Sequence, residues 1–356
     1  MAAEDLKAAL LEGGSTASSA VGFLQLCQVS YLPASAIPVA VRRLPPLNAG
    51  GSWQCAWGPA QSSDQSNLAF VATYYYGPGL PVFAATVIRG TDTDVSDGWG
   101  IIEQLWQDLD VIFWEPLPWE PNHPARVACG TLDALTKIQG LISGGRTLQN
   151  FLTGFLGDPA NGQPLAVVTG HSLGGCLTTV VAPWLKYALA QSGIRNPIVP
   201  ASFAGPTAGN PAFARYYDSQ FNSGARFYNT LDVAPCGWGQ LPAVETIYQP
   251  CGLDIPDIPY LAIAVWEGAM YRFGVEYAQP ATNNAPLTGT CYATNNWYDE
   301  LAYQHHTTTY MTLLGGTSVH SEVMPLQSTV RARSLRSTLY ERFGTSAGLL
   351  AARRPQ

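Results

Sequence analysis

The sequence predicts an α/β fold with a mostly parallel central sheet flanked by helices. Short apolar runs rich in β-branched residues alternate with longer segments in which apolar residues recur at helical spacing. This alternation indicates strand–helix–strand units, whose parallel strands end at one common edge of the sheet. The strongest unit is residues 164–175, where an apolar strand runs into a Gly-rich turn and then a helix. We expect residues 1–356 to form a single domain.

The composition favours a large core and a surface that is poor in charge. Apolar residues make up 47% of the chain, whereas charged residues make up only 12%, about half the usual share. Such a surface suits a protein that meets lipophilic material. The formal net charge is -7 and no cluster of Lys and Arg is present, so we do not expect nucleic acid as a partner.

The sequence contains no readable targeting or membrane-spanning segment. Residues 1–14 lack a basic region followed by an apolar one, which a secretory signal requires. No uncharged apolar run reaches the ~18 residues that cross a bilayer. The localisation stays open between a cytoplasmic protein and one exported without a classical signal.

Seven cysteines are present and none forms a C-x-x-C pair, so we expect no zinc site. The serine chemistry considered below requires no other metal and no cofactor. Two interpretations of the cysteines stay open. Cys236 and Cys251 could close a small loop, or most of the seven could be buried free thiols.

The first third of the chain predicts a helix and then a group of strands. The helix covers residues 17–31, and the strands cover 52–57, 68–76 and 82–88, the last two forming a hairpin around a Gly-Pro-Gly turn. Residues 97–109 form a helical pattern in a tryptophan-rich region. This segment is either a core helix or a lid that opens at a lipid surface.

The second third of the chain contains the central unit. Helices are predicted over residues 131–141 and 147–156, followed by a strand over 165–168 and a helix over 173–191 that Pro183 should kink or split. Beyond them we expect further elements in this order: a strand over 197–204, a helix over 212–221, a strand over 225–229, an irregular insertion over 236–296, a helix over 307–314, and a C-terminal helix over about 328–343.

The turn between the central strand and helix carries the pattern G-x-S-x-G, with Ser172 at its centre. We expect a strained serine backbone, and we expect Gly170 and Gly174 to leave room where a Cβ would collide with neighbouring backbone. The helix that begins at Leu173 presents free N–H groups that suit an oxyanion. An upstream strand ends in Gly90-Thr91, either a plain turn or the place of a second oxyanion donor.

A serine hydroxyl needs a base, and the five histidines make the search short. His171 directly precedes the serine and should point to the opposite face, while His123 lies upstream in a proline-rich connection. The order Ser, acid, His leaves His305 and His306 at the start of a helix, and His320 in a polar loop.

The acid that holds the imidazole should follow a strand end between the serine and the histidine. Asp232 meets this condition because it follows the strand over 225–229. Asp218 lies within a predicted helix, and Asp254 and Asp257 lie in the irregular insertion, so they fit less well.

The chain resembles the class 3 lipases, a family of fungal-lipase-like α/β hydrolases with bacterial and plant members, and it looks like a bacterial-type one. The resemblance covers residues 17–314 and rests on five motifs in order: Ile88-Arg89-Gly90-Thr91, Thr169-Gly170-His171-Ser172-Leu173-Gly174-Gly175, residues 203–211 (FAGPTAGNP), residues 229–235 (NTLDVAP), and Gln304-His305 ahead of Tyr310.

The resemblance implies a nucleophile at Ser172, an acid at Asp232 and a base at His305. It also implies an oxyanion hole formed by the backbone N–H groups of Leu173 and Thr91, and a lid over about residues 92–120. Two adjacent histidines occupy the base position, and the spacing to Tyr310 favours the first of them.

The activity that the resemblance implies is that of a lipase or carboxylesterase, a serine hydrolase that forms an acyl-enzyme. Its substrates would be acylglycerols or other lipophilic esters, met at an oil–water or membrane interface. Two alternatives stay open: a non-catalytic lipid-binding module on the same scaffold, and a serine enzyme or acyltransferase acting on other acyl substrates such as polyesters.

Overall fold

The computed structural model describes residues 17–47, 50–77, 79–90 and 111–319. Its centre is a seven-stranded sheet in the order β1-β2-β3-β8-β9-β10-β11. The strands are β1 Gly51–Gln61, β2 Leu68–Tyr76, β3 Pro81–Ile88, β8 Leu165–His171, β9 Ile198–Phe203, β10 Ala225–Asn229 and β11 Asn284–Leu287. β1, β2 and β3 pair antiparallel, which confirms the predicted hairpin, and the five strands from β3 to β11 are parallel.

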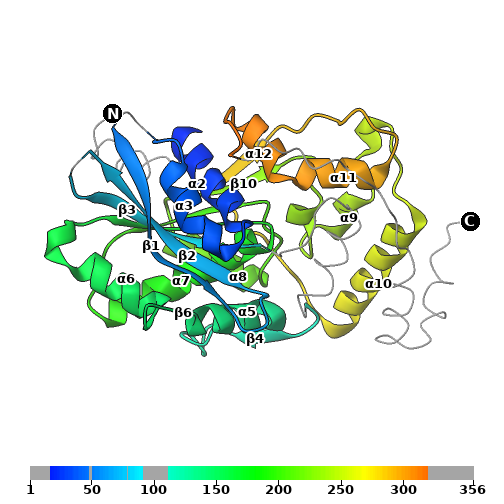
Figure 1. Cartoon of the computed structure of the whole chain (residues 1–356). Helices are drawn as coiled ribbons and strands as arrows, with labels where there is room; N and C mark the ends of the chain where they lie inside the picture. Colours follow the sequence, from blue (N-terminus) through cyan, green and yellow to red (C-terminus); the bar gives the residue numbers. More distant parts are fainter. Residues whose placement is uncertain (1–16, 48–49, 78, 91–110, 320–356) are drawn as a thin grey trace, which may run out of the picture.

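Helices cover both faces of this sheet (Figure 1). One face packs against α2 Ala17–Ser30, α3 Ile37–Arg43 and α12 Thr307–Leu313. The other face packs against α5 Cys129–Gly140, α6 Leu148–Gly157, α7 Leu173–Gln191 and α8 Pro211–Gln220, and its core continues into α9 Leu241–Val244, α10 Asp257–Phe273 and α11 Trp297–His305.

Alternation along the central strands divides the core between the two faces. In β8, Ala166 and Val168 join the core on the α7 side, whereas Leu165 and Val167 join the core on the α2 side. A strand buried on both faces has to be apolar at every position, which explains why these runs stand out in the sequence without alternating polarity.

Helix α7 runs without a break from Leu173 to Gln191, with Pro183 inside it, so the predicted split does not occur. By length and composition α7 is the one described helix that could cross a membrane. However, 83% of the relevant stretch is buried within the protein. α7 is therefore a core helix on which the sheet packs.

The segment over 236–296 contains regular elements that the sequence analysis did not predict. α10 is a 17-residue helix, and β11 extends the parallel sheet beyond β10. Trp238, Ile263 and Trp266 are buried and belong to the core beside α7, so this segment is not only a surface excursion. Its helical pattern is weak in sequence because proline and glycine interrupt it and both α10 faces contain aromatic residues.

A disulfide joins Cys251 to Cys291 across this segment. Cys236 is a free thiol, so the possible pairing of Cys236 with Cys251 is wrong. The two partners lie 40 residues apart in the chain, and the fold between them decides which cysteines meet.

Removing this cross-link should lower stability. We expect Cys291→Ser to reduce the free energy of unfolding by about 2–4 kcal/mol, because the unfolded chain regains the entropy of an open loop. Urea unfolding under non-reducing conditions measures the change, with Cys55→Ser, which removes a free thiol, as the matched control. Equal midpoints for the two variants would contradict the prediction.

Several expected elements lie outside the described residues. These are the helix over 97–109 with most of the expected lid, the C-terminal helix over 328–343, and His320. The described end of the expected lid contains strand β4 Trp114–Pro116, which pairs with β5 Arg126–Ala128. Val111 and Leu117 in this stretch are buried in the core.

Candidate active site

Ser172 occupies the tight turn between β8 and α7, called the serine elbow below, and has a strained backbone. Its φ is 60° and its ψ is -126°, values that a residue with a side chain rarely adopts. A Cβ on Gly170 would lie 2.3 Å from the carbonyl oxygen of Gly174, and a Cβ on Gly174 would lie 2.3 Å from that of Ile88. The expectations of strain and of two obligatory glycines are thus confirmed.

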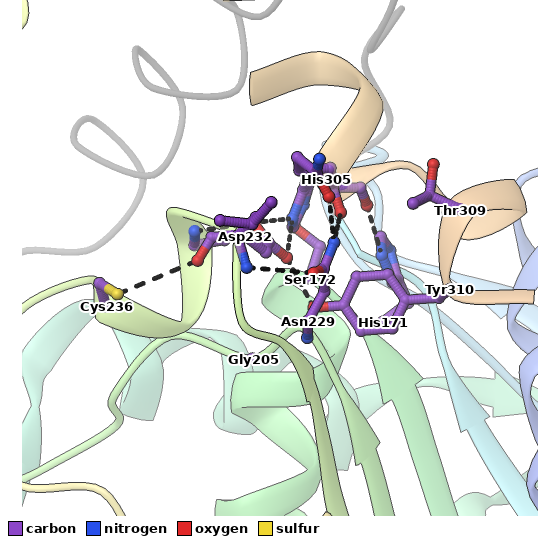
Figure 2. A network of polar contacts seen from close by, with 12 residues as sticks. His171, Ser172, Gly205, Asn229, Asp232, Cys236, His305, Thr309 and Tyr310 are labelled. Atoms are coloured by element: carbon purple, nitrogen blue, oxygen red, sulfur yellow. Dashed lines mark hydrogen bonds and ion pairs between the residues drawn. The ribbon is translucent and has the colours of Figure 1, made fainter. Parts of the chain in front are cut away.

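The hydroxyl of Ser172 lies 2.8 Å from Nε2 of His305 (Figure 2). His305 is the last residue of α11 and lies two residues before Thr307, the first residue of α12, so it does precede the helix that the sequence predicted here. Its side chain is buried between the ends of β8 and β10. Residues 133 positions apart in the chain therefore meet at the carboxyl edge of the parallel sheet.

Asp232 holds the other side of the imidazole. Nδ1 of His305 lies 2.9 Å from Oδ2 and 3.1 Å from Oδ1 of this carboxylate, whose side chain is fully buried. A carboxylate only accepts hydrogen bonds, so Nδ1 carries the proton and donates it. Nε2 is then free to accept the hydrogen bond from the Ser172 hydroxyl, which is the orientation that a general base needs.

Two further groups hold Asp232 in place. The hydroxyl of Tyr310 donates to Oδ2 at 2.7 Å, and the backbone N–H of Ala234 donates to Oδ1 at 2.9 Å. Burial and the neighbouring carboxylate raise the pKa of Tyr310 well above its usual value, so its hydroxyl stays protonated and keeps donating. The Tyr310 oxygen also accepts from the backbone N–H of Asn229 at 3.0 Å.

The expected oxyanion donors lie next to the serine as far as the structure describes them. Leu173 is the first residue of α7, where backbone N–H groups have no partner within the helix. Thr91 lies outside the described residues. Its neighbour Gly90, two residues after the end of β3, lies directly against the turn that holds Ser172, since a Cβ on it would lie 2.6 Å from the carbonyl oxygen of His171 and 3.3 Å from Cβ of Ser172.

Residues 87–239, which include the elbow and Asp232, match the family model described as lipase (class 3). This segment is therefore similar to the class 3 lipases. The resemblance predicted from the sequence motifs is confirmed, and with it the expected enzyme class, a lipase-type hydrolase. A search of curated protein sequences finds no significant match.

The fold is similar to that of solved lipase structures. The chain is similar to the crystal structure of M37 lipase, with a TM-score of 0.70 and 23% identity over 84% of this chain and 91% of that one. This similarity confirms the α/β-hydrolase fold. A Rhizomucor miehei lipase–propeptide complex gives 0.44 and 23% over 61% of each chain, and an MDLA mutant from Penicillium cyclopium gives 0.48 and 16% over 82% and 88%.

Of the two adjacent histidines, the structure brings only His305 to the serine. His306 is the N-cap of α12, where its Nδ1 contacts the hydroxyl of Thr308 at 2.7 Å and accepts from the Thr308 N–H. The two rings diverge because the chain turns between α11 and α12. Sequence spacing alone favoured the first histidine without excluding the second.

A buried carboxylate that the sequence analysis missed holds the helix that ends in His305. Glu300 is fully buried, and its oxygens accept from the Tyr292 N–H at 3.0 Å and from the Gln304 side chain at 2.7 Å. Gln304 in turn accepts from the Asn229 side chain at 2.6 Å. The helix and the Asp232 loop are thereby tied together. In sequence, Glu300 looks like an ordinary exposed helix residue.

His171 adds an acid sensitivity to the fold. Burial, with the nearby His305 and His306 as further causes, holds the pKa of His171 well below its usual value. The unfolded chain therefore binds a proton below about pH 6.5 that the folded protein does not bind. Stability contributed by the neutral ring is complete above this pH and is lost as the pH falls.

We expect the free energy of unfolding to decrease from pH 7.5 to pH 5.5, and to decrease less steeply in His171→Gln. The difference in slope should approach one proton, or about 1.4 kcal/mol per pH unit. Urea unfolding at several pH values measures both slopes. Identical slopes in the two proteins would show that His171 does not carry this dependence.

Proposed function

We propose that this protein is a serine ester hydrolase that cleaves lipophilic carboxylic esters, with acylglycerols as the leading class. The observation that carries the proposal is the chain of hydrogen bonds from Asp232 through His305 to Ser172, at 2.9 Å and 2.8 Å. The proposed roles are nucleophile for Ser172, general base and acid for His305, and orienting acid for Asp232.

In the proposed reaction Ser172 Oγ attacks the ester carbonyl carbon while its proton passes to Nε2 of His305. The oxyanion that forms is stabilised by the Leu173 N–H at the start of α7 and, as we propose, by the N–H of Thr91. His305 then gives its proton to the leaving alcohol, and an acyl-Ser172 ester remains. Water, deprotonated by the same imidazole, hydrolyses this ester and restores the serine hydroxyl.

The substrate class rests on the family and on the charge-poor composition. A chain in which only 12% of the residues are charged is compatible with contact to a lipid phase. We propose that residues about 92–120 act as the lid. We also propose that the 236–296 segment contributes residues that contact the acyl chain of the substrate, since its buried residues belong to the same core as those of α7.

Labelling with a fluorophosphonate tests the proposal directly, because such probes phosphonylate a serine only when a base activates it. We expect rapid labelling of the native protein at Ser172, found by peptide mass mapping, and hydrolysis of p-nitrophenyl butyrate that stops in proportion to labelling. Protein unfolded in urea is the control and should not react.

The same experiment separates the alternatives. A native protein that stays unlabelled and hydrolyses no ester would support a non-catalytic lipid-binding module. Labelling at Ser172 without ester hydrolysis would instead indicate a serine enzyme for other acyl substrates.

A further inference from the structure

We propose that His171 is a positioning residue that fixes the main chain of His305 relative to Ser172. The inference rests on the proposed function and names a group for which the reaction steps above have no role. Figure 2 shows His171 beside His305, with a dashed line between the His171 ring and the His305 main chain.

The geometry is a two-point attachment of one residue to two neighbours. Nε2 of His171 lies 3.0 Å from the carbonyl oxygen of His305, and Oγ of Ser172 lies 2.8 Å from its side-chain Nε2. Consecutive residues at the end of β8 thus hold both the backbone and the ring of the base. A shift of α11 away from β8 would break both contacts together.

The position of His305 makes a backbone contact necessary. It ends α11, and the last carbonyl groups of a helix have no N–H partner within it. The chain then turns at His306 into α12. The His171 ring supplies a donor to the carbonyl oxygen at this junction, where the helix itself supplies none.

Tyr31 favours the tautomer of His171 that carries its proton on Nε2 and can donate from it. A carbonyl oxygen only accepts, so Nε2 of His171 must carry a proton. In the neutral ring Nδ1 is then an acceptor, and the Tyr31 hydroxyl lies 3.1 Å from it, in place to donate. Tyr31 directly follows α2, which packs on the opposite face of the sheet, so that face takes part in positioning the base.

The ring also has to stay neutral while His305 gains a proton. The centroids of the two rings lie 4.9 Å apart, and a charge on His171 would oppose the imidazolium that forms on His305 during turnover. The low pKa of the buried His171 agrees with this requirement.

A matched pair of amide variants tests the role. In His171→Gln the amide reaches the place of the imidazole Nε2 and can donate to the carbonyl oxygen, whereas in His171→Asn the same amide is one methylene too short. We expect kcat for p-nitrophenyl butyrate to fall about 10- to 100-fold in the Asn variant, with KM changed less than about threefold. The Gln variant should recover most of the kcat, and the rate of fluorophosphonate labelling should follow kcat.

An Asn variant with kcat within about threefold of the wild type, or a Gln variant as slow as the Asn variant, would overturn the inference. Tyr31→Phe keeps the test valid if the Asn variant does not fold. Without the phenol, the proton of the His171 ring can move to Nδ1, which leaves an acceptor at Nε2 facing the His305 carbonyl. We expect kcat to fall about 3- to 10-fold. An unchanged kcat in Tyr31→Phe would contradict the role. Wild-type protein without esterase activity or labelling would instead reject the proposed function itself.

Discussion

Ser172→Ala is expected to lower kcat for p-nitrophenyl butyrate by about 10⁴- to 10⁶-fold. The hydroxyl is the only group that the structure places within hydrogen-bond distance of the free Nε2 of His305, among the described residues. Without it no acyl-enzyme can form, and only binding and oxyanion stabilisation remain. The variant should also lose all fluorophosphonate labelling.

The fold should tolerate this change. Alanine removes one oxygen from a strained position, so the circular dichroism spectrum and the urea midpoint should stay close to those of the wild type. Ser219→Ala, which removes a hydroxyl that bonds the Tyr216 carbonyl in α8, is the matched control and should leave kcat unchanged. Turnover of Ser172→Ala near the wild-type rate would reject the serine mechanism.

Asp232→Asn is expected to lower kcat by about 10³- to 10⁴-fold. The carboxylate accepts from His305, Tyr310 and the Ala234 N–H, so it meets donors on every side. An amide presents its NH₂ group to at least one of them. If this group faces His305, Nδ1 becomes the acceptor, Nε2 carries the proton, and the ring can no longer take the proton from Ser172.

The loss in Asp232→Asn should lie in kcat more than in KM, because the acid contacts the base and not the substrate. Steady-state kinetics over pH 6–9 measure both constants. Asp218→Asn provides a control, since Asp218 accepts from residues 281 and 282 at the surface, far from His305 in the hydrogen-bond network. An Asp232→Asn variant that keeps a tenth or more of the wild-type kcat would show that another group orients the imidazole.

Local patterns were sufficient for the centre of the fold. The strands β3, β8 and β9 are buried on both faces, and burial leaves continuous apolar runs that a sequence shows directly. The serine elbow could also be recognised from its sequence pattern, because a turn this tight excludes Cβ atoms at Gly170 and Gly174. The position of Asp232 followed from the rule that sites lie at the carboxyl ends of parallel strands.

Patterns failed where contacts between distant segments replace local preferences. Helix α10 and strand β11 lie in a stretch rich in proline and glycine, and they are held by the buried Trp266 and by pairing with β10. The disulfide partner of Cys251 is Cys291, which only the path of the chain between them brings into reach. Glu300 can be buried because the Gln304 side chain and the Tyr292 N–H donate hydrogen bonds to its carboxylate. The residues next to Glu300 in the sequence do not indicate these contacts.

The sequence by itself determined the parallel α/β sheet and the serine elbow, because steric limits at a turn and burial on two faces restrict which residue types can stand there. Only the tertiary structure decided which histidine meets the serine, and it did so by ending α11 at His305 and turning His306 into the cap of α12. It also decided that His171 holds the His305 backbone with the help of Tyr31. Hydrogen bonds between residues 130 or more positions apart depend on how helices dock on the sheet, and the order of residues along the chain does not encode that docking locally.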